Sequence, residues 1–305
     1  KFRAKQLFSW LHQKQVTEFD QMTTLSLQLR QKLNEKFCIN RLNIARRLAS
    51  STDDTVKYLY ELPDGNFVET VLMDYHHGKS LCISTQVGCR IDSIVLMGTG
   101  EPLDNYDNLL RFIRLLTDEN GLNISQRNLT VSTCGIVPRI RQLADLRLGV
   151  TLSVSLHSPE NRHRSEIMPI NRRYPVEELL DACRYYFDTT GRRVTIEYAV
   201  INGVNNTRAD ALQLARRLRG MQCHVNLIPV NPIRERSFRS FRKDVERFQR
   251  ELTGLGINAT IRRTLGSDIQ AACGQLRRDA DQQKQTAAQT VKNESGNTLF
   301  GGGKN

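Results

Sequence analysis

Reactive residue types recur where apolar segments of this chain end. Cys82 lies in a short apolar segment, and Cys89 follows that segment seven residues later. A second apolar segment leads into Gly98–Pro102, where glycines let the backbone approach a ligand and Glu101 offers a carboxylate to a cation or an ammonium group. Cys273 lies among small residues, an environment typical of a reactive thiol. The residue types therefore indicate thiol chemistry beside a ligand-binding turn.

Further residues at the ends of later apolar segments are Ser132, Ser155, Leu156, His157 and Asn231. These residues and the turn at Gly98–Pro102 also have explanations that involve no ligand. A glycine-rich turn is at least as often a plain tight turn, and a lone histidine more often has a structural role than a functional one. We interpret four further cysteines as small core hydrophobes on apolar faces, namely Cys38, Cys134, Cys183 and Cys223.

The elements that must position these residues alternate between strand and helix. We predict strands at Leu81–Thr85, Ile94–Met97, Leu129–Ser132, Val150–Leu156, Val194–Ile201, Val225–Val230 and Ile257–Arg262. Predicted helices between them include Asn108–Thr117, Val176–Tyr186, Ala209–Leu218 and Lys243–Leu252. This alternation predicts a parallel sheet, open or closed into a barrel. Ligands of such folds bind at the carboxyl ends of the strands, where the polar residues lie.

The first 80 residues follow other patterns. Two helical stripes predict a small helical unit, the first with Leu7, Phe8, Trp10 and Leu11 and the second with Met22, Leu25, Leu29, Leu33 and Phe37. Alternating apolar and polar residues around Pro63-Asp64-Gly65 predict a β-hairpin. After Leu276 the chain has almost no core residues, so we expect disorder there.

Composition narrows the class of protein. The chain has 305 residues, 39% of them hydrophobic, without an apolar run near the 18 residues of a membrane span. The net charge of +12, mostly from paired arginines, favours a polyanionic partner such as nucleic acid. Seven scattered cysteines are not a secreted disulfide framework. We expect a cytoplasmic protein, although Lys1 is not a natural start.

One connection is too short. About eight residues separate the first two predicted parallel strands, whereas a parallel crossover needs roughly a dozen or more, usually with a helix. A segment is therefore expected, and missing, near Arg90 and Ile91.

Five motifs occur together in an order and spacing that one enzyme family shares. They are LCISTQVGC, MGTGEPLDNYDN, SLHSP followed by MPINRRYP, HVNLIPVNP and DIQAACGQL. Over residues 2–276 the chain closely resembles the RlmN/Cfr family of radical S-adenosylmethionine RNA methyltransferases. The strings LIPVN and TIRRTLGSDI are more similar to RlmN, which methylates carbon 2 of adenine, than to Cfr, which methylates carbon 8.

The resemblance implies an α/β fold, a partial parallel (β/α) barrel of the radical SAM type with a small N-terminal helical accessory domain and a β-hairpin linker. We expect the RNA-binding accessory domain at residues 1–40, the linker at 41–79, the barrel at 80–276 and a disordered tail at 277–305. The resemblance also implies that the protein is a monomer that methylates 23S ribosomal RNA, with transfer RNA as a further substrate. The electron donor would be a reductant such as flavodoxin, and no membrane partner is expected.

The resemblance also assigns roles to single residues. Cys273 matches the cysteine that receives a methyl group, Cys82 the cysteine that later forms a disulfide with it, and Glu69 the base that removes the ring proton. S-adenosylmethionine would bind at Gly100, Glu101, Ser132, Ser155, Leu156, His157 and Asn231, with Glu101 paired to its ammonium group. Without the resemblance, Glu69 reads as an ordinary strand residue.

The family explains the short connection. Its members carry a C-x-x-x-C-x-x-C loop that starts at the position of Cys89 and holds a 4Fe–4S cluster, followed by a helix. Here Cys89 is present as the first metal ligand, but the other two cysteines and the helix are not. Either the full chain has further residues there, or the segment is deleted. We favour the first, because losing a crossover helix would expose core and reverse strand order.

Three classes of function follow from these alternatives. A radical methyltransferase requires the missing cysteines, and a cluster-less relative that binds RNA without catalysis requires a true deletion. A thiol redox protein would use Cys82 and Cys273 and would need neither RNA nor S-adenosylmethionine.

Overall fold

The computed structural model describes residues 2–62, 64–75, 78–83, 93–97, 100–230 and 240–263. The strands within these ranges are β1 (Asn43–Ala49), β2 (Val56–Glu61), β3 (Phe67–Tyr75), β4 (Gly78–Ile83), β5 (Ser93–Leu96), β6 (Leu129–Thr133), β7 (Thr151–Ser155), β8 (Val194–Val200), β9 (Cys223–Pro229) and β10 (Ala259–Ile261). The helices are α1 (Phe2–His12), α2 (Leu27–Lys36), α3 (Tyr106–Thr117), α4 (Val137–Asp145), α5 (Asn161–Ile167), α6 (Val176–Thr190), α7 (Arg208–Leu218) and α8 (Arg242–Gly254).

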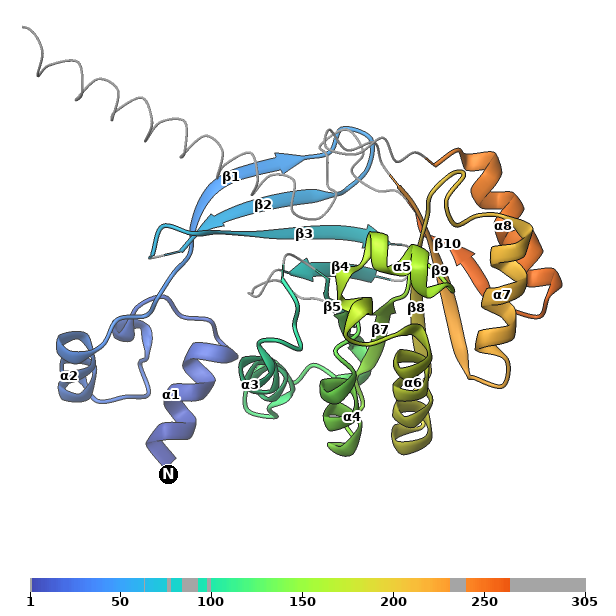
Figure 1. Cartoon of the computed structure of the whole chain (residues 1–305). Coiled ribbons are helices and arrows are strands. Elements are labelled where there is room, and N and C mark those ends of the chain that lie inside the picture. The colour runs from blue at the N-terminus through green and yellow to red at the C-terminus, as the bar shows by residue number, and fades with distance from the viewer. Residues whose placement is uncertain are drawn as a thin grey trace, which may run out of the picture.

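The strands form one sheet whose spatial order is the order of the sequence, from β1 to β10 (Figure 1). The first four strands pair antiparallel, and β4 to β10 pair parallel. Sequential order is typical of a (β/α) barrel, because a doubly wound sheet reverses its order partway. In the described residues β1 and β10 do not pair, so the barrel is partial. The predicted fold class is confirmed.

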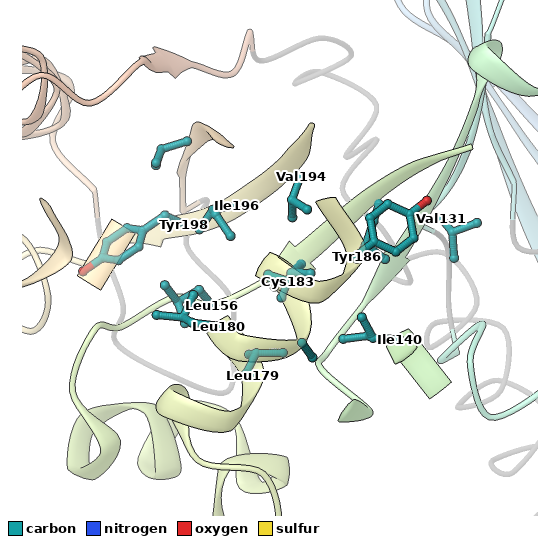
Figure 2. Packing of buried hydrophobic residues seen from close by; sticks show 14 of the residues in the cluster. Val131, Ile140, Leu156, Leu179, Leu180, Cys183, Tyr186, Val194, Ile196 and Tyr198 are labelled. Atoms are coloured by element: carbon teal, nitrogen blue, oxygen red, sulfur yellow. The ribbon is translucent and has the colours of Figure 1, made fainter. Parts of the chain in front are cut away.

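Helices cover one face of the parallel strands. Each step from β5 to β10 contains at least one helix, as Figure 1 shows for α3, α4, α6, α7 and α8. Apolar residues that pair across neighbouring strands, such as Leu96, Val131 and Leu152, pack under these helices in the main core. Figure 2 shows Leu180, Cys183 and Tyr186 of α6 within this core. Burial of this face explains why these strands were recognisable in the sequence.

The opposite face of the sheet carries mainly small and polar side chains on β6 to β8, with the apolar Val71, Met73 and Val95 on β3 and β5. Strand residues alternate between faces, so residues that lie directly opposite one another share a face. Register joins Lys57, Val71, Cys82, Val95, Thr130 and Thr151 into one row across β2 to β7. A second row joins Ser155, Glu197 and Asn226. Glu69 and Ser132 lie two residues from members of the first row and belong to the same face, which we call the polar face.

The N-terminal residues form a small helical unit with its own core of Phe19, Met22 and Leu25. The second predicted helix is partly wrong, because α2 begins only at Leu27. Met22 and Leu25 are buried in the turn before it, whereas Phe37 is 63% exposed after its end. A turn also places apolar residues three apart, so spacing alone did not locate the helix start. Phe8 of α1 approaches Gly121, after α3, and so joins this unit to the barrel.

The hairpin of β2 and β3 is confirmed, and the sheet adds a strand, β1, that was not predicted. The residues expected to be a linker lie in the same sheet as the barrel strands, since β3 pairs with β4. The domain limits at 40, 79 and 276 stay predictions. Cys38 is exposed rather than buried, which corrects its interpretation as a core residue, while Cys183 is fully buried as expected.

The short connection lies between neighbouring parallel strands, as expected. Ser80 pairs with Ser93 and Cys82 with Val95, and only residues 84–92 connect the two strands. Every later parallel step has a helix, whereas residues 84–92 lie outside the part of the chain that the structure describes. None of the described helices has the length and apolar character needed to cross a bilayer.

We predict that Gly135→Ala costs about 3 kcal/mol of unfolding free energy and that Gly203→Ala costs about 1 kcal/mol. Both glycines have positive φ, 111° and 74°. An added Cβ at Gly135 would lie 2.9 Å from a methyl carbon of Leu179, whereas at Gly203 it meets no atom within 4 Å. Urea denaturation of both variants measures the difference, and equal losses would contradict this packing.

Candidate active site

Arg164 of α5 joins the ends of β6 and β7. Its guanidinium donates from Nη2 to the carbonyls of Cys134 at 2.8 Å and Ser155 at 3.1 Å, and from Nε to the carbonyl of Leu156 at 3.1 Å. Nη1 donates to Asn171 Oδ1 at 3.0 Å. The side chain is fully buried, which lowers its pKa to about 10 and leaves it charged at neutral pH. Arg164 therefore fixes the strand ends on which the predicted cofactor residues lie.

Glu101 joins the segment after β5 to the end of β6. Its Oε1 accepts from the backbone N–H of Leu103 at 3.0 Å, and its Oε2 accepts from that of Cys134 at 2.7 Å. A carboxylate can accept about four hydrogen bonds in all. Each oxygen therefore keeps capacity to accept from an ammonium group. At the adjacent Gly100, φ is 107° and an added Cβ would meet no atom within 4 Å, so the backbone there is open to a ligand.

His157 occupies a left-handed conformation, with φ of 58°, directly after β7. The backbone N–H of Ala199 donates to its Nδ1 at 3.0 Å, so the ring proton lies on Nε2. Asn205 Nδ2 donates to the carbonyls of His157 and Ala199, both at 2.7 Å. Burial, with a smaller effect of Arg164, lowers the pKa of His157 to about 4. The imidazole is therefore a neutral group that joins β7 to β8.

Leu156 has a different place from its neighbours. Its side chain is buried in the main core, its N–H donates to the carbonyl of Glu197, and its carbonyl accepts from Arg164. Ser132 and Ser155 are half-buried on the polar face. The structure thus brings Glu101, Ser132, Ser155 and His157 to one edge of the sheet, with Leu156 shaping that edge.

Glu69 and Cys82 lie on the polar face of β3 and β4. Val71 separates them, since it lies directly opposite Cys82 and two residues from Glu69. Glu69 Oε2 is 3.5 Å from Lys57 Nζ, and the two side chains are 4% and 0% exposed. Cys82 is buried beside Val71 and Met73. The two described residues with predicted catalytic roles are therefore on the same face of neighbouring strands.

A second buried carboxylate lies farther along the polar face. Glu197 on β8 accepts from Ser153 Oγ and from Asn226 Nδ2, both at 2.8 Å. Burial raises its pKa, although these two hydrogen bonds and Arg262 act against the shift. Glu197 thus has neutral donors on both oxygens.

Three predicted site residues, Cys89, Asn231 and Cys273, lie outside the described residues. Sequence reasoning missed Arg164, Asn205, Lys57 and Glu197, which hold the site together. Arg164 lies in the charged stretch NRHRSEI, where nothing in the pattern separates a buried arginine from a solvated one. For Lys57, the alternation in TVKYLYE marked a strand but not which face was buried.

The residues present fit the two implied cofactors unequally. S-adenosylmethionine fits the open backbone at Gly100 and the acceptor capacity of Glu101. A cluster with three cysteine ligands does not fit, because residues 84–92 contain one cysteine, Cys89. In the described part of the chain, no three His, Cys, Asp or Glu side chains are grouped to hold a metal ion. The next cysteine after Cys89, Cys134, has a pKa raised to about 12 by burial and Glu101, which disfavours the thiolate.

We predict that His157 makes the protein less stable as the pH falls from 6.5 toward 4. In the unfolded chain its pKa returns to about 6.5, so the unfolded state binds a proton that the folded state does not. The free energy of unfolding should decrease by up to about 3 kcal/mol over this range. Urea denaturation at several pH values measures it, with His157→Asn as control because asparagine tolerates positive φ and does not titrate. Parallel curves for both proteins would contradict the assignment.

Two family models match the chain. Residues 1–39 match a ribosomal RNA large subunit methyltransferase N-terminal domain, and residues 86–215 match the radical SAM superfamily. A radical SAM methyltransferase from Sphaerobacter thermophilus has a similar crystal structure, with a TM-score of 0.84 and 40% identity over 90% of this chain and 92% of that one. The sheet and its helices are therefore those of a radical SAM methyltransferase.

Curated relatives agree over most of the chain. Probable dual-specificity RNA methyltransferases RlmN are 48% identical in Clostridium novyi, over 92% of both chains, and 49% identical in Lachnospira eligens, over 91% of this chain and 90% of the relative. The first alignment spans 316 residues, whereas 92% of 305 residues is about 281. About 35 alignment positions thus have no residue here, which exceeds the dozen or so residues that a parallel crossover needs. The chain belongs to the RlmN family of radical SAM RNA methyltransferases.

Proposed function

We propose that the protein methylates carbon 2 of an adenosine in 23S ribosomal RNA, with transfer RNA as a second substrate, through a methylated Cys273. The observation that carries this proposal is that Glu69 and Cys82, the base and the resolving thiol of the family, lie on one face of adjacent strands in a chain 48% identical to an RlmN relative. The excess of positive charge favours contacts with RNA phosphates.

S-adenosylmethionine would bind at the strand edge that Arg164 and Asn205 fix. Glu101 would accept from its ammonium group, and Ser132, Ser155, His157 and Asn231 would complete the site. The neutral His157 ring, with its proton on Nε2, can donate one hydrogen bond there. The backbone that carries these side chains is already fixed by hydrogen bonds from Arg164 and Asn205. Binding therefore loses little conformational entropy at these strand ends.

The polar face would hold the target base. Glu69 would accept the ring proton, and the electron pair of the broken C–H bond would stay in the ring. The Cys82 thiolate would then attack the Cys273 sulfur and form a disulfide as the C–S bond breaks. The electron pair of that bond would stay with the methylene carbon and the ring, and a proton from solvent would complete the methyl group. Cys82 is buried beside the apolar Val71 and Met73 of β3.

The 4Fe–4S cluster that the family uses does not fit the 305 residues, because the connection between β4 and β5 supplies one cysteine, Cys89. We propose that the natural chain carries a longer connection between Ile83 and Ser93 that supplies two further cysteines. The nine-residue connection favours a second candidate function, an RNA-binding relative without catalysis, if the gene itself lacks the segment.

Iron binding separates the two candidates. We predict that the 305-residue protein assembles no cubane cluster on anaerobic reconstitution. The same chain with the corresponding segment of the Clostridium novyi relative inserted between Arg90 and Ile91 should bind about four irons. Cys89→Ala in the longer chain should abolish this binding. Four irons in the 305-residue protein would show that other residues supply the ligands and would contradict the assignment of Cys89.

In protein that carries the cluster, the variants of Cys273 and Cys82 should stop the reaction at different steps. Cys273→Ala should remain unmethylated and unattached to RNA, because the carrier sulfur is gone. Cys82→Ala should stall as a covalent RNA–protein species, because no second thiolate attacks the Cys273 sulfur. Denaturing gels with and without nuclease detect the species, and Cys183→Ala is a matched control with a buried thiol in the main core. Nucleoside mass spectrometry of RNA treated with the unmodified enzyme should find 2-methyladenosine, and 8-methyladenosine would overturn the proposed position.

A further inference from the structure

Lys57 and Glu69 form an ion pair inside the sheet. Lys57 on β2 lies opposite Val71 on β3, and Leu59 lies opposite Glu69, so the two charged residues are diagonal neighbours on the polar face. The ammonium nitrogen is 3.5 Å from Glu69 Oε2. Val71 also lies opposite Cys82 on β4. The pair therefore adjoins the thiol with the proposed resolving role.

The pair is costly to bury. Lys57 is 0% exposed and Glu69 4%, and Lys57 is the one fully buried lysine of the described residues. Removing two charges from water costs several kcal/mol per ion, and apolar residues of similar volume often give an equally stable or more stable protein. The neighbours Val71, Met73 and Cys82 form an apolar cluster in which such a replacement would pack. Fold stability alone therefore does not account for charges at these positions.

The other buried glutamate of the polar face provides a contrast. Glu197 accepts from a serine hydroxyl and an amide, and burial raises its pKa. Glu69 instead has a cation beside it, since Lys57 Nζ lies 3.5 Å from its Oε2. The two buried carboxyl groups of the polar face therefore have different partners, one charged and the other neutral.

We propose that Lys57 is a positioning residue that holds Glu69 as a carboxylate on the polar face, ready to accept a proton from the RNA base beside Cys82. This inference rests on the proposed function for the identity of the proton donor. In the proton transfer, Glu69 becomes neutral and the electron pair of the C–H bond stays in the ring. Lys57 keeps its own proton throughout, because it acts through Glu69.

Infrared difference spectroscopy with ¹³C-labelled glutamate tests the inference without any cofactor. At neutral pH, the spectrum of the protein minus that of Glu69→Gln should show a carboxylate band for Glu69. In a Lys57→Met background the same subtraction should show loss of that band and a protonated carboxylic acid in its place. Lys57→Arg should retain the carboxylate band, because it keeps the cation. An unchanged carboxylate band in Lys57→Met would overturn the inference.

Controls separate this effect from unfolding. The difference spectrum obtained by subtracting Glu197→Gln should show the same bands with and without Lys57→Met. The reason is that Glu197 accepts hydrogen bonds from its own donors on β7 and β9. The double variant Lys57→Met/Glu69→Gln, which buries no charge, provides a second folded background for comparison. Methyladenosine formation is measured separately, in the chain that carries the inserted segment of the Clostridium novyi relative and has bound its iron. Its failure with the band loss present would leave the inference intact and reject the proposed function, whereas methylation with an unchanged band would reject the inference alone.

Discussion

A single buried cation holds the ligand edge of this fold together. Parallel strands end with carbonyl groups that have no partner within the sheet, and buried carbonyls must be satisfied. Arg164 satisfies three of them, on the ends of β6 and β7, with one planar side chain. A lysine could not do so, since it lacks the fixed fork of donors. Glu101, His157 and Asn205 then build outward from the strand ends that Arg164 fixes.

The parallel strands and their helices could be predicted from the sequence because each depends on a short-range pattern of apolar residues. Strands buried under helices are short continuous apolar runs, and amphipathic helices between them have a clear period. Strand β1 could not be read, because it lies at the sheet edge with nearly every residue exposed and so has no pattern of burial. The start of α2 was wrong for the opposite reason, since Met22 and Leu25 are buried in a turn whose spacing imitates a helix.

The residues of the candidate site also form two groups, those that could be predicted from the sequence and those that could not. The resemblance to the family assigned roles to Glu69, Cys82 and the strand-end residues, and these assignments stay predictions. The residues that hold them were not identified. Arg164 and Asn205 act through buried hydrogen bonds with partners that are distant in the chain, such as Cys134 and His157. Lys57 is a charged residue at a core position, a choice that contradicts every local preference. Such contradictions mark places where function and not propensity selects the residue.

The alternation of β2, β3 and β4 limits how this protein can evolve. Lys57, Glu69 and Cys82 lie on one face only because Glu69 and Val71 are two positions apart and because Val71 pairs with Lys57 on β2 and with Cys82 on β4. A single residue inserted between Glu69 and Val71 would turn Glu69 toward the opposite side of the sheet and would interrupt the hydrogen-bonded ladder at a β-bulge. The polar face would then lose its proposed base. Length changes in relatives should therefore be confined to the turn between Glu61 and Phe67, where the parity of the strands is not affected.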